Sequence, residues 1–205
     1  MTKVLGVVLA GGLATRMGGG DKGLLPLGDG TLLDQVLRRL APQVTGMALN
    51  ANGDPDRFAR YRLTVLADTI EGYPGPLAGV LAGLDWAAKN GADQIVTVAA
   101  DTPFFPVDLV TRLQEATAGM AHPLALAATP GIERKLDRHP TFGLWPVALA
   151  DDLRQALTQG TRKVVLWTDT HDGRNAVFAS EDDPFFNVNT PDDLAHAQTR
   201  ARGAA

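Results

Sequence analysis

Short apolar runs alternate along this chain with segments whose apolar residues recur at helical spacing. Residues 4–10 are continuously apolar, which is typical of a strand buried on both faces. A helix is predicted between Thr31, which is a suitable cap, and Pro42, which would stop it. Its apolar positions follow the helical repeat and are Leu32, Leu33, Val36, Leu37 and Leu40.

The rest of the chain continues this alternation. Strands are expected at residues 46–50, 63–67, 94–100, 124–128, 141–145 and 175–179, and helices at residues 76–90, 106–118, 147–157 and from Pro191 onward. The sequence of residues 162–167 fits a helix and a strand equally well. This order predicts one α/β domain, residues 1–205, with a mostly parallel central sheet and helices on both faces. A chain of this length is readily built around a single core.

Composition narrows the class of protein. With 45% hydrophobic and 20% charged residues, the chain is typical of a soluble globular protein. It contains no cysteine, which excludes disulfides and thiolate metal sites. The net charge of -4 argues against broad binding of nucleic acid. Lys3 and the uncharged run 4–15 loosely resemble a signal peptide, but we expect a cytoplasmic protein without a membrane span.

The stretch VVLAGGLATRMGGGDKGLLPL, Val7 to Leu27, is the main candidate for chemistry. A P-loop requires a hydroxyl after its lysine, whereas Gly23 follows Lys22 here. The glycines at 18, 20 and 23 have the spacing of a dinucleotide-binding fingerprint. That fingerprint begins at the end of the strand, however, and these glycines come well after it. A flexible turn is the other interpretation. Arg16 and Lys22, placed among glycines that leave backbone N–H groups accessible, favour a polyphosphate site.

Polar residues also follow several predicted strands. Asp68 and Asp101 come directly after two of them, and each is either a turn or cap residue or an oxygen ligand for Mg²⁺. Asn187 and Asn189 lie two apart on an extended segment, so both side chains face the same way, toward a ligand or toward loop backbone. Thr190 has the position of a helix cap.

A basic stretch, residues 130–141, contains Arg138 and His139 and is either a solvated loop or a second anion site. Gly160, Arg162 and Lys163 are candidates to extend such a site. The four histidines lack the spacing of metal ligands.

Taken together, these pieces resemble the molybdenum cofactor guanylyltransferase family. The matching segments are VVLAGGLATRMGGGDKGLLPL, LNANGD, LADTIEGYPGPLAG, AADTPFFP, RHPTFGLWP, GTRKV and FFNVNTPDDL. The resemblance implies a single-domain Rossmann-like nucleotidyltransferase fold. It also implies that residues up to about 120 bind the nucleotide and that residues 121–200 bind the pterin acceptor.

The resemblance further implies roles for individual residues. Arg16, Lys22 and Asp101 would be catalytic, with Asp101 also binding Mg²⁺. Molybdopterin would lie near Arg138, His139, Asn187 and Asn189. GTP would contact Leu9, Ala10, Gly11, Gly12, Lys22, Asn50, Asp68 and Asp101.

The implied reaction is transfer of GMP from GTP to the terminal phosphate of molybdenum-molybdopterin, with release of pyrophosphate. Cytidylyltransferases of the same group tend to read LAAG where this chain reads LAGG, and to carry aspartates at the positions of Asn187 and Asn189. A cytidylyltransferase, a sugar-1-phosphate nucleotidyltransferase and a non-catalytic GTP-binding or cofactor-carrier protein are the alternatives. The family also suggests a monomer in transient contact with cofactor-biosynthesis or molybdoenzyme-maturation proteins.

Overall fold

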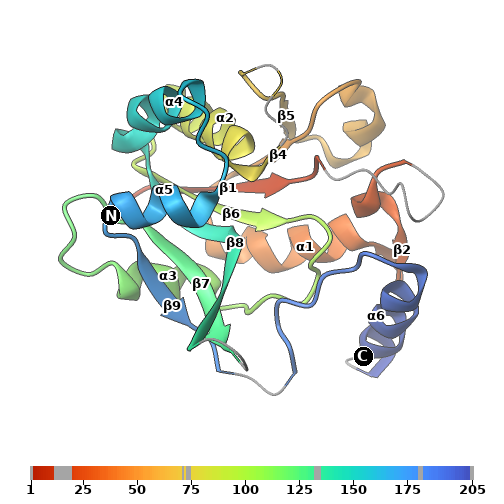
Figure 1. The fold of residues 1–205 in the computed structure, drawn as a ribbon. Helices are drawn as coiled ribbons and strands as arrows, with labels where there is room; N and C mark the ends of the chain where they lie inside the picture. The colour runs from red at the N-terminus through yellow and green to blue at the C-terminus, as the bar shows by residue number, and fades with distance from the viewer. Residues whose placement is uncertain are drawn as a thin grey trace.

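The computed structural model describes residues 2–11, 20–70, 72, 75–131, 135–179 and 182–203. Within these residues, one seven-stranded sheet has the order β5-β4-β1-β6-β8-β7-β9 (Figure 1). Its strands are β1 (Val4–Leu9), β4 (Met47–Asn50), β5 (Thr64–Leu66), β6 (Gln94–Ala99), β7 (Ala125–Pro130), β8 (Leu136–Pro146) and β9 (Arg174–Val177). β8 is antiparallel to both of its neighbours, and the other pairings in this sheet are parallel. The prediction of a mostly parallel α/β sheet is therefore confirmed.

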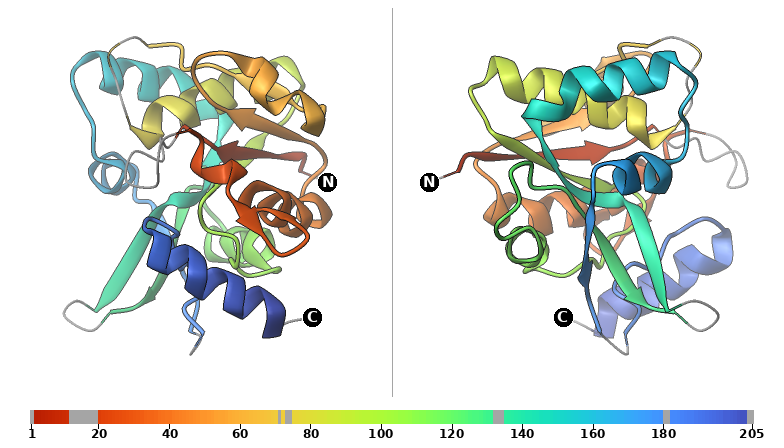
Figure 2. Two further views of the ribbon diagram at one scale, coloured as in Figure 1. Left: turned by 90° about the vertical axis from the view of Figure 1, so that its right-hand side faces the viewer. Right: turned by 60° about the vertical axis from the view of Figure 1, so that its left-hand side comes forward.

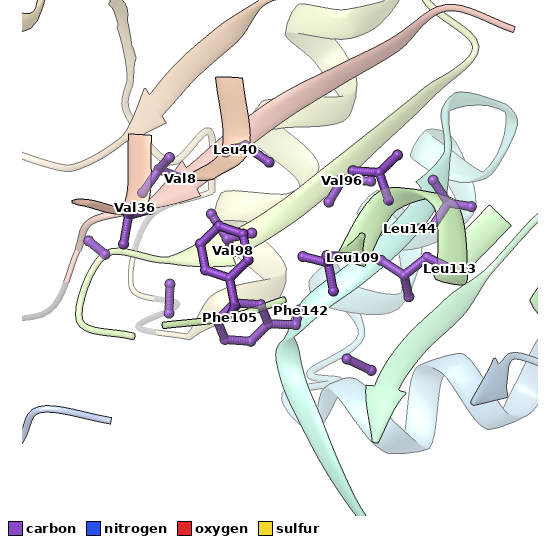
Figure 3. Close-up of a cluster of buried hydrophobic side chains, with 14 of the residues drawn as sticks. Val8, Val36, Leu40, Val96, Val98, Phe105, Leu109, Leu113, Phe142 and Leu144 are labelled. Atoms are coloured by element: carbon purple, nitrogen blue, oxygen red, sulfur yellow. The ribbon is translucent and has the colours of Figure 1, made fainter. Parts of the chain in front are cut away.

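Helices cover both faces of the sheet (Figures 1 and 2). One face packs against α1 (Leu32–Leu40) and α3 (Leu109–Ala116), and the other against α2 (Pro76–Lys89), α4 (Ala150–Thr158) and α5 (Val164–Thr170). Side chains alternate between the two faces along each strand, so Val8 of β1 joins the first core and its neighbour Val7 joins the second. Figure 3 shows the first core around Val98, Phe105 and Phe142. These two cores explain why the central strands are apolar on both sides.

A third, smaller core lies beside the sheet. It joins the hairpin of β2 (Pro26–Leu27) and β3 (Gly30–Thr31) to the last helix, α6 (Pro191–Gly203), as the left view of Figure 2 shows. Its buried residues are Leu27, Leu32, Phe104, Val188 and Ala197. Because the hairpin begins a few residues after Lys22, this packing places the C-terminal segment of the chain close to Lys22.

Local signals decide where the helices begin. Thr31 caps α1 as predicted: the Asp34 N–H donates to Thr31 Oγ1 at 3.2 Å, and the Thr31 N–H donates to Asp34 Oδ2 at 2.8 Å. Thr190 does the same for α6, where it accepts from the Asp193 N–H at 3.1 Å and donates its own N–H to Asp193 Oδ2 at 2.8 Å. Such reciprocal boxes satisfy N–H groups that the first helical turn leaves unpaired.

Several boundaries differ from the expected ones. The basic stretch 130–141 is not a loop throughout, because Leu136–Pro140 already belongs to β8, which pairs with β7 as a hairpin. The run 162–167 is mostly helical, since α5 begins at Val164. The helix expected from Val147 starts with a 3-10 turn, η5 (Val147–Leu149), before α4. The short 3-10 helices η2 (Lys22–Leu24), η3 (Ala41–Gln43) and η4 (Pro55–Tyr61) were not predicted.

Within the described residues, no helix is long and apolar enough to cross a membrane.

Candidate active site

A cavity of about 350 Å³ lies at the carboxyl ends of β1, β4 and β6. From β1 the chain passes to β4 on one side, while β6 pairs with β1 on the other. Such a switch point leaves a crevice where open α/β sheets bind ligands. The cavity is lined by Leu9, Gly11, Asn50, Asn52, Asp68, Gly75, Pro76, Ala99, Asp101, Thr141 and Asn187.

Lys22 lies where the C-terminal segment meets the end of β6. Its Nζ donates to Asn189 Oδ1 at 2.6 Å and lies 3.5 Å from Asp101 Oδ2. The Lys22 and Asp101 side chains are only 19% and 21% exposed. The structure thus brings together three residues that the sequence analysis assigned to catalysis or substrate binding from separate motifs.

The segment around Asn187 is attached to the turn that follows β6. The Val188 N–H donates to the backbone oxygen of Asp101 at 2.9 Å, and the Thr102 hydroxyl donates to Asn187 Oδ1. The Asn189 N–H donates to Asp193 Oδ2 at 2.9 Å, and this bond is the largest cause that lowers the pKa of Asp193. The cap of α6 therefore holds the backbone of Asn189 in place while its side chain accepts from Lys22.

Asp101 does not serve as the cap of the following helix. Residue 108 holds the cap position of α3, and the Asp101 carboxylate instead lies near the Lys22 ammonium and 3.3 Å from the Thr102 hydroxyl oxygen. Asp101 is therefore a turn residue but not a helix cap, and its role as a ligand stays a prediction. A carboxylate at a strand end beside a cation is suited to binding a metal–phosphate ligand.

Asp68 is held on the opposite wall of the cavity by two asparagines. Asn50 Nδ2 donates to Asp68 Oδ1 at 2.9 Å, and Asn52 Nδ2 donates to Asp68 Oδ2 at 2.8 Å. Asn52 Oδ1 also accepts from the Asp68 N–H at 2.8 Å. An ionised carboxylate has about four acceptor sites, so both oxygens retain capacity for a ligand. Sequence reasoning assigned no role to Asn52, although it lies two residues after Asn50 in LNANGD.

Thr141 reaches the cavity through a β-bulge that the sequence analysis did not predict. Leu126 of β7 pairs with Gly143, but the next residue, Ala127, pairs with His139, so residues 140–142 of β8 lie outside the ladder. Bulges near functional sites redirect side chains, and Pro140 is the one available signal, because proline cannot donate to a ladder.

Gly79 of α2 leaves room for the Asn50 side chain. A Cβ atom built at Gly79 would lie 2.1 Å from Asn50 Oδ1 and 2.9 Å from Leu9 Cδ2. Asn50 is itself bound to Leu66 O at 3.0 Å as well as to Asp68. We expect Gly79→Ala to displace Asn50 and weaken nucleotide binding about tenfold, equivalent to about 1.4 kcal/mol.

Calorimetric titration with nucleotide measures this effect. Gly203→Ala is the matched control, since no other part of the described chain, beyond its neighbours and the backbone of its own helix, lies within 4 Å of the added methyl group. Unchanged affinity in a folded Gly79→Ala protein would contradict the inferred role of the Asn50–Asp68 contact.

The two acceptor-side candidates on β8 have structural partners. Arg138 Nη1 donates to Asp169 Oδ1 at 2.6 Å, and the His139 ring stacks on Phe185 with centroids 4.2 Å apart. His139 Nε2 also lies 3.0 Å from the Thr129 hydroxyl. Neither Arg138 nor His139 is among the lining residues of the cavity at the strand ends. Their role toward molybdopterin stays a prediction.

Burial lowers the pKa of His139 below its ordinary value, against the opposing effect of nearby aspartates. As the pH falls below about 6.5, the unfolded chain therefore takes up a proton at this residue before the folded chain does. Stability is full above that pH and falls as the pH decreases toward the lower, folded-state pKa. We expect His139→Phe, which keeps a ring against Phe185, to lose less stability between pH 7.5 and 5.5 than the unmodified protein. Thermal unfolding at both pH values measures this difference, and exposed His122→Gln should show the unmodified loss.

A second cavity, of about 670 Å³, lies between α4 and α5. Trp167 lines it, and the Trp167 Nε1–H donates to Asp152 Oδ1 at 3.0 Å, which also lies 2.7 Å from His171 Nε2. Arg162 and Lys163, the cations noted in GTRKV, also line it, together with Ala156, Gly160, Thr161, Leu166 and Thr170. Its lining shares no residue with that of the first cavity.

Two predicted site residues, Gly12 and Arg16, lie outside the described residues.

The chain resembles known proteins over nearly its whole length. Residues 6–174 match the family described as MobA-like NTP transferase domain. A molybdenum cofactor guanylyltransferase of Mesorhizobium japonicum is 51% identical over 200 residues, which cover 95% of this chain and 94% of that protein. A protein of the same name from Bradyrhizobium sp. is 50% identical over 204 residues, which cover 98% of this chain and 94% of that protein.

Solved structures show the same fold at lower identity. Molybdopterin-guanine dinucleotide biosynthesis protein A of Archaeoglobus fulgidus superposes with a TM-score of 0.73 at 22% identity, covering 97% of this chain and 99% of that one. CMP:2-keto-3-deoxy-manno-octonic acid synthetase, solved with CTP, has a TM-score of 0.75 at 14% identity and full coverage of both chains. The relatives at about 50% identity identify the family, whereas these structures, at 22% and 14% identity, show only the fold. This chain belongs to the molybdenum cofactor guanylyltransferases, within the MobA-like NTP transferase family.

Proposed function

We propose that this protein transfers GMP from GTP to the terminal phosphate of molybdenum-molybdopterin, releasing pyrophosphate and forming a guanine dinucleotide cofactor. The observation that carries the proposal is the convergence of Lys22, Asp101 and Asn189 beside a cavity at the carboxyl ends of the strands. The names of the relatives support guanylyl transfer and the molybdenum cofactor.

The reaction requires alignment and charge neutralisation more than proton transfer. The attacking phosphate oxygen is already ionised at neutral pH, so no general base is needed. Two anions must nevertheless be brought together, and a preorganised cation favours this. The Lys22 ammonium has three N–H donors, of which Asn189 accepts one at 2.6 Å. We assign the ammonium to the phosphates of GTP.

The residues around Asp101 fit a magnesium ion. No group of three His, Cys, Asp or Glu residues suited to a metal occurs in the part of the chain that the structure describes. Mg²⁺, however, is usually held by one or two carboxylates together with waters and substrate phosphates, which a single Asp101 can satisfy. The ion would neutralise phosphate charge. Asn189, which accepts from Lys22, is a neutral amide and therefore a weaker metal ligand than a carboxylate.

We place the acceptor on the side of Asn187 and Asn189, in the half of the chain after about residue 120. The cations Arg162 and Lys163 line the second cavity, which is separate from this side of the site and offers a further place for an anionic group. We further propose that the enzyme acts in the cytoplasm as a monomer, in transient contact with proteins that supply or receive the cofactor.

Pyrophosphate release with each of the four nucleoside triphosphates, with and without molybdopterin, tests the proposed function. We expect Mg²⁺-dependent release only when GTP and molybdopterin are both present. A preference for CTP would identify a cytidylyltransferase, and release with a sugar 1-phosphate would identify another acceptor. GTP binding without pyrophosphate release under any of these conditions would indicate a carrier protein. Each of these three results contradicts the proposal.

A further inference from the structure

Arg57 links two parts of the site that are distant in sequence. It lies on η4, which the sequence analysis did not predict. Its Nη2 donates to the backbone oxygen of Asn52 at 2.6 Å and its Nη1 to that of Asp54 at 2.7 Å. Its Nε lies 2.8 Å from Asp21 Oδ2. The guanidinium therefore joins the segment after β4 to the residue that directly precedes Lys22.

Two partners of Arg57, Asp21 and Asn52, adjoin residues assigned to the nucleotide site. Asp21 is the residue before Lys22, whose Nζ donates to Asn189. Asn52, whose backbone oxygen accepts from Arg57, uses its side chain to hold Asp68. A shift of the Arg57 side chain would therefore act on both walls of the cavity.

The environment of Arg57 restricts its movement. The Arg57 and Asp21 side chains are 28% and 12% exposed, and the guanidinium carbon lies 4.8 Å from the ring centre of buried Phe58. The Arg57 Nε is buried without an aligned hydrogen bond in the described residues, so its contact with Asp21 depends on charge rather than on direction. Most exposed ion pairs contribute little because two mobile side chains must be ordered. Here the two backbone oxygens already orient the guanidinium.

We propose that Arg57 and Asp21 are positioning residues that hold Lys22 at the correct place opposite Asp68 for transfer of the nucleotidyl group. This inference rests on the proposed function, since it concerns the same site. A misplaced cation binds phosphate in the ground state but aligns it poorly in the transition state. Loss of either residue should therefore lower kcat more than it raises KM for GTP.

Steady-state transfer kinetics with GTP, Mg²⁺ and molybdopterin test this inference. We expect Arg57→Ala and Asp21→Asn each to lower kcat about tenfold, with a smaller change in KM. The double variant should be no slower than the slower single variant, because both changes interrupt one contact. In a Lys22→Ala background, Asp21→Asn should lower kcat no further, since its effect on kcat passes through Lys22.

Arg38→Ala is the matched control. Arg38 and Asp29 form a similar pair at 2.9 Å, but their side chains are 54% and 78% exposed and away from the cavity lining. This variant should keep the wild-type kcat. If Arg57→Ala does not fold, judged by thermal unfolding, Asp21→Asn serves alone, because it leaves both carbonyl contacts of Arg57 in place.

Two results would overturn the inference: wild-type kcat in folded Asp21→Asn, or a further loss of kcat when Asp21→Asn is added to Lys22→Ala. Inactivity of the unmodified protein with GTP and molybdopterin is a separate result, which contradicts the proposed function instead.

Discussion

Lys22→Ala should lower the rate of guanylyl transfer by about 10² to 10³, the loss typical of removing one preorganised donor. Asp101 and Asn189 of the protein itself hold the ammonium in place, so its position costs little reorganisation during the reaction. Without the ammonium, one positive charge fewer is available to neutralise the phosphates. Folding should be affected much less, because partly exposed ion pairs contribute about 1 kcal/mol or less.

Single-turnover transfer kinetics together with thermal unfolding separate these two effects. Lys89→Ala removes an exposed ammonium at the end of α2 and should leave the rate unchanged. A folded Lys22→Ala protein with a near wild-type rate would show that the phosphates are held elsewhere.

Asp101→Asn is expected to abolish most activity and to weaken its dependence on Mg²⁺. The substitution keeps the size of the side chain and leaves the backbone bond from the Val188 N–H to Asp101 O intact. It removes the negative charge that a hard cation requires. By comparison with other losses of electrostatic stabilisation, the rate should fall by about 10² or more.

A titration of activity with Mg²⁺ measures this prediction. Asp29→Asn, which alters an exposed carboxylate with 78% of its side chain accessible, is the control and should reproduce the wild-type curve. An unchanged Mg²⁺ titration in folded Asp101→Asn would exclude Asp101 as a metal ligand.

Much of the fold was predictable because its signals are local. Continuous apolar runs indicated the buried strands, and Thr31 and Thr190 indicated where two helices begin. The hairpin of β7 and β8 was harder to predict, since its outer part is polar and lacks the apolar pattern of the central strands. The hairpin makes β8 antiparallel to β7, but the pairing of β8 with β6 depends on residues distant in sequence.

The candidate site was predictable as a set of residue types more than as an arrangement. Glycines beside Arg16 and Lys22 indicated a phosphate site, and carboxylates at strand ends indicated metal or nucleotide binding. Arg57 was missed because nothing in its immediate neighbours distinguishes it. Asn52 and Thr141 had only weak local signals, which were Asn50 two residues before and Pro140 directly before. His139 was chosen as a basic residue, yet the fold stacks its ring on Phe185.

The sequence by itself determined the element types, the glycine-rich stretch and the chemistry available at the strand ends, because spacing and residue type act over a few neighbouring residues. Only the tertiary structure decided which side chains meet. Lys22 and Asn189 are 167 residues apart, yet they share a 2.6 Å hydrogen bond. That contact depends on strand order and on the packing of α6 beside the β2–β3 hairpin. Both arise from burial of apolar surface across the whole chain, which no local pattern records.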